Sequence, residues 1–324
     1  MSMMSVGRVT VAVMSVAAAV AMTPPAAAGQ GGTFDPPRTA WGDPDLSGRY
    51  LPGPYQALET PANDSWAPPD GVNLGQGAAF SRFFEPDPDA PARPRASAPS
   101  GPMIIDPPSG RVPLQPWATE QRNEIMARQN QLDHLDPRVK CLPAAFPRAH
   151  LPVDYNTYQI VQGPGYILML YEWNHHSRYI PLDGSPHPDP AITLGMGDSR
   201  GHWDGTTLVV DTTNFTDNTW PVGHGAPPDD APGTAITTGH GIFHSGQLHV
   251  VERFTFVDAD TIQYEATIED PEVFTQPWTL RYNALQRAPD DHMLFEYACH
   301  EGNGRNLSLM TGTDVEAARV HPIR

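Results

Sequence analysis

The chain has 324 residues, a formal net charge of −17 at pH 7, and Lys140 as its only lysine among 20 basic residues. Nucleic acids and anionic membranes bind to positively charged patches. The acidic net charge and the lack of a basic cluster in the sequence therefore argue against both as partners. A single lysine argues against Schiff-base chemistry, which needs a desolvated amine.

The N-terminal segment 1–28 has the pattern of a cleavable secretory signal. Arg8 supplies a positive charge, an apolar run follows from Val9 to Met22, and small residues end the segment. This order is typical of a signal peptide, and we expect cleavage after Ala28. No later stretch reaches the roughly 20 apolar residues of a membrane-spanning helix. The sequence predicts a periplasmic or secreted protein without a membrane span.

Residues 29–116 are predicted to form an arm that packs on the folded body. They hold eighteen of the 37 prolines and have no sustained helical or strand period, as is typical of a wrapping segment or a linker. Apolar residues such as Trp41 indicate docking on the body. One helix is expected next, with Thr119 as its N-cap and an end near Leu132.

From residue 155 onward the sequence has the pattern of antiparallel strands separated by turn signals. The predicted strands are Tyr158–Val161, Tyr166–Trp173, Arg178–Leu182, Thr207–Thr213, Leu248–Val257, Thr261–Ile268, Trp278–Leu285 and His292–Cys299. Eight strands without intervening helices form an antiparallel sheet that curls into a barrel or splits into a sandwich. We therefore predict an all-β domain over 117–324, with a lipocalin-like barrel preferred.

Two cysteines, Cys141 and Cys299, are present in the chain. In an oxidising compartment an even number of cysteines indicates a disulfide, and free thiols or metal ligands are the alternatives. A disulfide would join the start of the folded domain to its end.

Strand alternation places carboxylates in otherwise apolar rows. Glu252 shares a face with Phe254 and Phe256, and Glu172 and Asp270 continue two similar rows. Burial raises the pKa of a carboxylate toward the range useful for general acid or base catalysis. The alternative for each is a structural ion pair with an arginine.

Histidines are concentrated in the same half of the chain, with ten of the 13 between His175 and His300. Among them, His202, His244 and His300 fall at expected strand ends or turns, where a barrel mouth gathers its ligands. None belongs to a compact metal-binding motif. We predict no metal and no cofactor, and a metal site or purely structural histidines are the alternatives.

Gly197–Gly201 matches the G-x-S-x-G pattern, which exposes a nucleophilic serine between a strand and a helix. The next residues, from His202 to Asp211, have the pattern of a turn and a strand. Because the helix is missing, we reject a serine nucleophile and expect a glycine-bounded loop.

Several distinctive short sequence strings are spread over nearly the whole predicted mature chain. They are Pro44–Gly48, Asp106–Pro113, Cys141–Pro143, Gly197–Gly205, Val251–Phe254, Asp270–Pro271, Pro277–Trp278 and Glu296–Asn303. Together they resemble a large, mostly uncharacterised family of secreted bacterial proteins usually called hypothetical. The resemblance implies a shared secreted fold and supplies no mechanism. This chain departs from the family pattern at two places: Thr206 stands where the family commonly has aspartate, and the stretch after Asn303 lacks the usual tyrosine.

The first functional hypothesis is a cofactor-independent acid–base enzyme of the lyase, isomerase or hydrolase type, with a lyase or isomerase favoured over a serine hydrolase, acting on a small molecule in the barrel. In this scheme Glu252 or His244 removes a proton, His202 or His300 returns one, and Arg253 or Arg178 stabilises negative charge. The residues predicted to bind substrate are Glu172, Arg178, Trp203, Asp270, Trp278 and Glu301.

The second hypothesis is a non-catalytic, lipocalin-like binding protein whose cavity is lined by aromatic side chains such as Trp203 and Trp278. Nicotinamide and flavin enzymes are disfavoured, because the chain has no glycine-rich fingerprint between a strand and a helix.

Overall fold

The computed structural model describes residues 34–52, 56, 58–59, 102–127, 132–151, 157–222 and 241–299. The predicted signal segment and most of the predicted arm lie outside these residues. The described part contains one α-helix, α1 (Pro116–Ala127), and four 3-10 helices, η2 (Leu132–His134), η3 (Pro137–Lys140), η4 (Arg148–His150) and η5 (Trp173–His175). Its strands are β1 (Gly48–Pro52), β2 (Ile104–Asp106), β3 (Tyr158–Gly163), β4 (Tyr166–Tyr171), β5 (Ser177–Pro181), β6 (Asp198–Asp204), β7 (Thr207–Thr213), β8 (His249–Phe256), β9 (Thr261–Glu269) and β10 (Trp278–Arg287).

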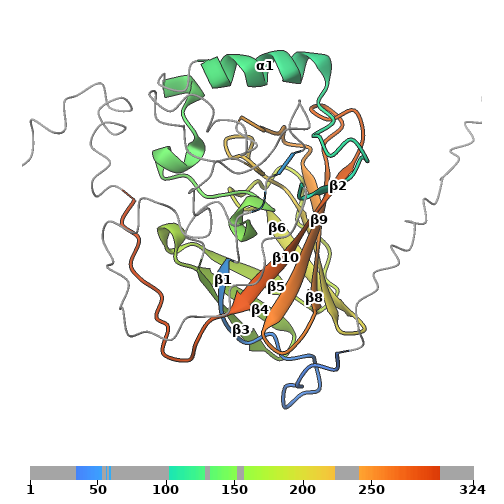
Figure 1. The fold of residues 1–324 in the computed structure, drawn as a ribbon, viewed down its shortest axis with the longest axis vertical. Helices are drawn as coiled ribbons and strands as arrows, with labels where there is room; N and C mark the ends of the chain where they lie inside the picture. The colour runs from blue at the N-terminus through green and yellow to red at the C-terminus, as the bar shows by residue number, and fades with distance from the viewer. Residues whose placement is uncertain are drawn as a thin grey trace, which may run out of the picture. The chain divides into compact units, whose positions relative to one another are not determined.

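The strands form one antiparallel sheet that curls into a nearly closed barrel (Figure 1). Its order is β5-β4-β3-β1-β10-β9-β8-β7-β6, and β2 pairs with β10 beside this path. Short turns link most neighbours, including one in which Gly165 takes the left-handed φ of 80° that a tight hairpin needs. The expectation of an all-β, mainly antiparallel fold is confirmed, in its barrel form.

The predicted arm supplies two strands to the sheet. β1 lies between β3 and β10, so it completes the barrel wall rather than wrapping around it. Its Tyr50 is buried, stacks on Tyr158 with ring centroids 6.0 Å apart, and donates to the Leu46 carbonyl at 2.9 Å. A five-residue strand between Gly48 and Pro52 is too short to show a period in the sequence.

Side chains close the seam between the two ends of the sheet, β5 and β6. A Cβ atom at Gly201 would lie 2.8 Å from Cγ2 of Ile180 and 2.7 Å from Cδ2 of Leu182. Only glycine leaves room for this contact. Arg178 of β5 also donates from Nε to Oγ of Ser199 on β6, at 2.8 Å. The seam is therefore packed and hydrogen-bonded at the level of these residues.

Three local predictions were wrong. Gly197–Gly201 runs into β6 rather than forming a loop, and Ser199 faces the interior. Helix α1 begins at Pro116, where the missing amide hydrogen is harmless, and the Thr119 hydroxyl donates to the Gln115 carbonyl from inside the helix instead of capping it.

The third is the predicted strand His292–Cys299, which contains no strand in the structure. Its anchors come from elsewhere: Glu172 accepts from the Phe295 amide at 2.7 Å, and Arg49 binds the His292 carbonyl. Of the aromatic residues in this segment, Tyr297 packs on Trp173, whereas Phe295 is exposed.

The described barrel interior is filled by aromatic side chains. The largest buried ones include Tyr50, Tyr158, Tyr264, Tyr282, Phe146 and Phe254. Strand β8 shows how the sequence produces this packing, because its residues alternate strictly between buried and half-buried positions.

Candidate functional site

A buried ion pair lies at the centre of the barrel. Arg178, on β5, donates from Nη1 to Oε1 of Glu252 at 3.2 Å and from Nη2 to Oε2 of the same carboxylate, which comes from β8. Its guanidinium also donates to Ser199 of β6 and to Thr212 of β7, the latter at 2.8 Å. One side chain thus ties together four strands across the seam.

Protein groups occupy the remaining positions around this pair. Tyr264 donates to Oε1 of Glu252 at 2.8 Å, and the Arg178 guanidinium carbon lies 3.5 Å from the ring centre of Phe146, a cation–π contact. Burial lowers the pKa of Arg178, but the adjacent Glu252 charge outweighs that effect and the pKa is raised. The geometry matches the structural ion pair that the sequence left as the alternative.

His150, on η4, connects this ion pair to a neighbouring tyrosine. Its Nε2 lies 3.2 Å from the Tyr171 hydroxyl and 3.5 Å from Oε1 of Glu252. Burial, together with the positive charge of Arg178, holds the pKa of His150 well below its usual value. The ring is therefore neutral, and burial likewise raises the pKa of Tyr171.

A second buried ion pair fixes the loop region that carries His150. Arg148 donates to both oxygens of Asp136, at 2.9 and 2.6 Å, which is the bidentate geometry that arginine favours. Burial raises the pKa of Asp136, but the charge and hydrogen bonds of Arg148 exceed that effect and the pKa is lowered. This ion pair thus joins η4 to the residue that precedes η3.

A small pocket opens beside Tyr171. It encloses about 210 Å³ of empty space, including its mouth, and is lined by Ala144, Ala149, Tyr171, Trp173, His176 and Met196. None of these side chains carries a fixed charge. Because the figure of 210 Å³ includes open solvent, the enclosed cavity itself is only about 10 Å³, about the space of one water molecule, far below the roughly 300 Å³ of a usual ligand pocket.

We call Glu172–His176 the η5 turn; it forms one wall of the pocket and has an unusual backbone. Asn174 and His175 both have positive φ, 49° and 53°, although neither is glycine. Consecutive left-handed residues store strain, and such strain is concentrated at functional sites.

The same turn holds buried polar atoms that have no hydrogen-bond partner among the described residues. They are Nε1 of Trp173, both side-chain polar atoms of Asn174, and Nε2 of His176. Most buried polar atoms in proteins are hydrogen-bonded, so four atoms without a partner on three residues of one turn require an explanation. Burial and the neighbouring His175 lower the pKa of His176, which is neutral at pH 7.

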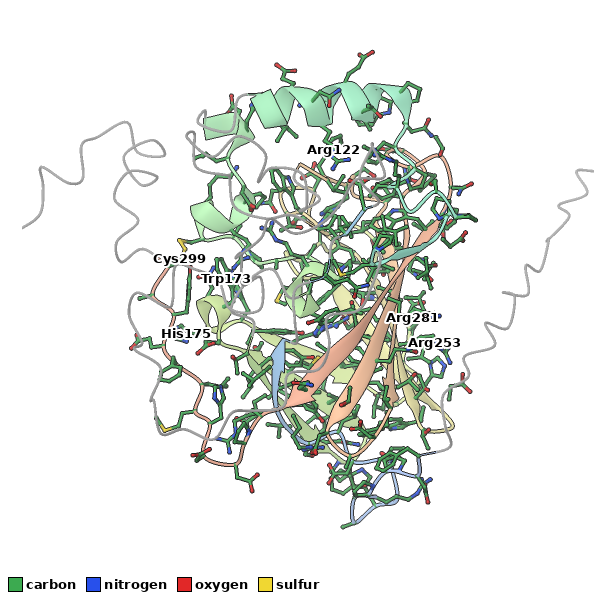
Figure 2. All side chains as sticks on the ribbon, in the orientation of Figure 1. Arg122, Trp173, His175, Arg253, Arg281 and Cys299 are labelled. Atoms are coloured by element: carbon green, nitrogen blue, oxygen red, sulfur yellow. A yellow bond between two sulfur atoms is a disulfide. The ribbon has the colours of Figure 1, made fainter. Side chains whose placement is uncertain are left out.

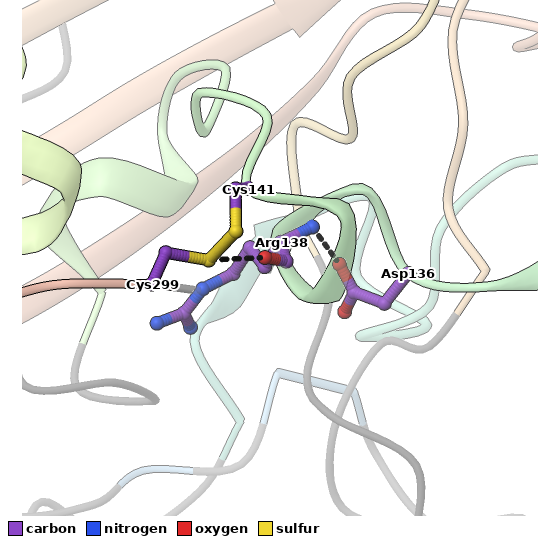
Figure 3. Close-up of a disulfide and its surroundings, with 4 residues drawn as sticks. All are labelled: Asp136, Arg138, Cys141 and Cys299. Carbon is purple, nitrogen blue, oxygen red and sulfur yellow. Dashed lines mark hydrogen bonds between the residues drawn. A yellow bond between two sulfur atoms is a disulfide. The ribbon is translucent and has the colours of Figure 1, made fainter. Parts of the chain in front are cut away.

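The C-terminal described segment packs on the outer side of this turn (Figure 2). The ring centres of Tyr297 and Trp173 lie 4.5 Å apart. The guanidinium carbon of Arg138 lies 3.4 Å from the ring centre of Trp173, which is a cation–π contact. A disulfide between Cys141 and Cys299 fixes the segment there, as predicted, and Cys299 Sγ contacts the Arg138 carbonyl (Figure 3).

Arg178, the alternative to Arg253 in the predicted scheme, pairs with Glu252, but the other described catalytic candidates are bound elsewhere or exposed. Arg253 lies on the opposite face of β8, where it pairs with Asp204 at 2.7 Å, well away from Trp173 in Figure 2. His202 is exposed. His244 is buried, with its pKa lowered by burial, and its two nitrogens contact the Thr219 hydroxyl and the Ser245 carbonyl. His300 lies outside the described residues.

Of the predicted substrate-binding residues, Arg178 contacts Glu252, and the other described ones lie in different parts of the fold. Asp270 accepts from the amide and hydroxyl of Ser245 and supports a turn after β9. Trp278 is buried in the core and Trp203 is half-buried. Glu172 begins the η5 turn, and burial raises its pKa. Glu301 lies outside the described residues.

Sequence reasoning missed His150, Tyr264 and His176 as site residues. The strand pattern already placed Tyr264 inward, but His150 lies in a proline-rich stretch without periodicity. The adjacent histidines at 175 and 176 were the available signal for the η5 turn.

Within the described residues, no three His, Cys, Asp or Glu side chains are arranged to hold a metal ion. No described helix is long and apolar enough to cross a membrane. Comparisons of the chain with protein-family models, with curated proteins and with solved structures found no match.

Proposed function

We propose that this protein is a cofactor-independent acid–base enzyme of the lyase or isomerase type, acting on a small uncharged molecule at the η5 turn. The observation that carries the proposal is the set of four buried, unpartnered polar atoms on Trp173, Asn174 and His176. They lie on a strained turn beside a pocket, and a ligand with hydrogen-bonding groups would satisfy them.

The pocket lining indicates the kind of substrate. Alanine, methionine and aromatic side chains favour an apolar or planar body, while Trp173 Nε1 can donate and His176 Nε2 can accept a hydrogen bond. Anions are disfavoured by the net charge of −17 and by a lining without arginine or lysine. A small neutral molecule with a carbonyl or hydroxyl group fits these properties.

Two titratable groups at the ends of the turn have perturbed pKa values of the required sign. His176, neutral because burial lowers its pKa, can take a proton from the substrate. Glu172, whose pKa is raised by burial, can return a proton to another substrate atom. In this proposal the ion pair of Arg178 and Glu252 keeps the pocket wall rigid through His150 and Tyr171.

We also propose that the enzyme acts outside the cytoplasm. The predicted signal segment and the Cys141–Cys299 disulfide support this location, because structural disulfides persist in oxidising compartments.

Deuterium uptake tests the proposal before the reaction is known. The protein is incubated in D₂O with a panel of small uncharged carbonyl and aromatic compounds, and mass spectrometry records the exchange of carbon-bound hydrogen. We expect exchange with at least one compound, reduced roughly 100-fold or more by His176→Gln and unchanged by Glu265→Gln, a substitution on the outer face of β9.

The second candidate, a binding protein, is favoured by the stack of Arg138, Trp173 and Tyr297, which resembles a recognition surface more than a reaction centre. A binding protein would retain a panel compound without exchanging its hydrogen. Saturable binding without exchange in any compound would replace the enzyme proposal with this one.

A further inference from the structure

A cluster of charged and titratable side chains fastens the β5–β6 loop, residues 182–197, to the outside of the barrel. This loop also carries Met196, which lines the pocket at the η5 turn. The loop therefore connects a surface cluster to the proposed site.

His187, in the middle of the loop, contacts two carboxylates. Its Nδ1 lies 2.8 Å from Oδ1 of Asp198 on β6, and its Nε2 lies 3.0 Å from Oδ1 of Asp211 on β7. An ionised carboxylate only accepts hydrogen bonds, so each ring nitrogen must carry a hydrogen. Both bonds form together only when His187 is an imidazolium ion.

His249, on β8, repeats this arrangement around the other oxygen of the same carboxylate. Its Nε2 lies 3.1 Å from Oδ2 of Asp211, and its Nδ1 lies 3.7 Å from Oε2 of Glu269 on β9. Two imidazole rings thus share Asp211. We call His187, His249, Asp198 and Asp211 the His–Asp clasp.

The other charged groups facing the clasp are Arg200, Glu269 and the loop's own Asp183. Arg200 pairs with Asp198 at 3.1 Å and donates to the Pro186 carbonyl at 3.0 Å. It therefore partly compensates the carboxylates when the histidines are neutral. Asp183 binds Ser185 within the loop, and Glu269 faces His249 alone.

The sign of the pH dependence follows from the residues that share Asp211. Hydrogen bonding to Asp211 raises the pKa of His249. Burial raises the pKa of Asp211, but the hydrogen bonds and charges of His249 and His187 outweigh it and the pKa is lowered. The His249 contribution is complete below about pH 6.5 and is lost as the pH rises through its raised pKa. The Asp211 contribution is lost only in stronger acid.

We propose that the His–Asp clasp regulates the η5 pocket, holding the β5–β6 loop and Met196 in place at mildly acidic pH and releasing them as the pH rises. Other contacts anchor the loop independently. Asn214 donates to the carbonyls of Asp189 and Ile192 at 3.0 and 2.9 Å, and the Leu194 amide donates to the Asn214 carbonyl at 2.9 Å, two residues before Met196. Release of the clasp therefore loosens the loop without detaching it. The link to catalysis rests on the proposed function; the movement of the loop does not.

Peroxide oxidation of Met196, followed by mass spectrometry at pH 5.5 and pH 8.5, measures this movement without any ligand. Exposed Met293 and buried Met169 are internal references in the same sample. We expect the rate at Met196, relative to Met293, to rise roughly three- to tenfold at the higher pH, as the loss of two partly exposed ion pairs allows.

His187→Gln and Asp211→Asn should both give the high rate at either pH, whereas His202→Gln, which removes an exposed imidazole from β6, should behave as the wild type. A wild-type rate that does not change with pH, or a His187→Gln variant that keeps the wild-type pH dependence, would overturn the proposal. Because no ligand is present, neither outcome bears on the proposed function.

Discussion

Replacing Arg178 by methionine tests the role of the central ion pair most severely. The substitution removes three hydrogen-bonding nitrogens that reach β6, β7 and β8, and the cation–π contact with Phe146. Among the described residues, it leaves the fully buried Glu252 carboxylate with a hydrogen bond from Tyr264 and with the neutral His150 ring 3.5 Å away. Ser199 and Thr212 keep each other at 3.2 Å, so their hydroxyls are not stranded.

The stranded carboxylate dominates the expected effect. Breaking a buried ion pair by removing one partner typically destabilises a protein by about 3–5 kcal/mol, and we expect a loss in that range for Arg178→Met. Adding Glu252→Leu should restore much of it, because two apolar side chains of similar volume replace the pair. Urea unfolding of the oxidised protein gives both free energies. A loss below about 1 kcal/mol for Arg178→Met, or no recovery in the double variant, would refute the reasoning.

Three further predictions concern stability. Replacing both Cys141 and Cys299 by serine should lower the free energy of unfolding by about 5 kcal/mol, because the bridge closes a loop across 158 positions; a change below 1 kcal/mol in urea would contradict this. Asp136→Ala should destabilise by about 3–5 kcal/mol at pH 7, with the difference from the wild type shrinking as the pH falls below about 4, since the lowered pKa of Asp136 makes its contribution disappear in acid. Gly201→Ala should destabilise the protein by about 1–3 kcal/mol through its clash at the seam and so lower the thermal midpoint, whereas Gly246→Ala, where a Cβ meets nothing within 4 Å, should have little effect; equal midpoints for the two variants would argue against a packed seam.

The sequence was sufficient for the strands that carry a clear alternation. In β8 and β9 every second residue is buried, so Glu252 and Tyr264 could be assigned to the interior from period two alone. β1, β2 and β6 were not predicted, because the first two strands have only five and three residues and the glycine-rich string of the third resembles a loop. Pairing with distant neighbours determines these strands, and a local pattern does not report such pairing.

The candidate site was predicted less well for a related reason. Glu252 was correctly placed inside, yet its partner Arg178 lies 74 positions away, and only the closure of the barrel brings them together. For Glu172 the row was misread: the inward residues of β4 are Ile167, Met169 and Tyr171, and Glu172 follows the strand in the η5 turn. The left-handed backbone at Asn174 and His175 was not predicted, although asparagine and histidine adopt it more often than most other non-glycine residues.

Crystallographic soaking with small uncharged aromatic and carbonyl fragments tests the location of the site most directly. The account predicts electron density in the pocket at the η5 turn, with a fragment within hydrogen-bond distance of Trp173 Nε1 or His176 Nε2. Fragments that bind only elsewhere, for example beside Arg253 and His202 on the outer face of the barrel, would contradict it.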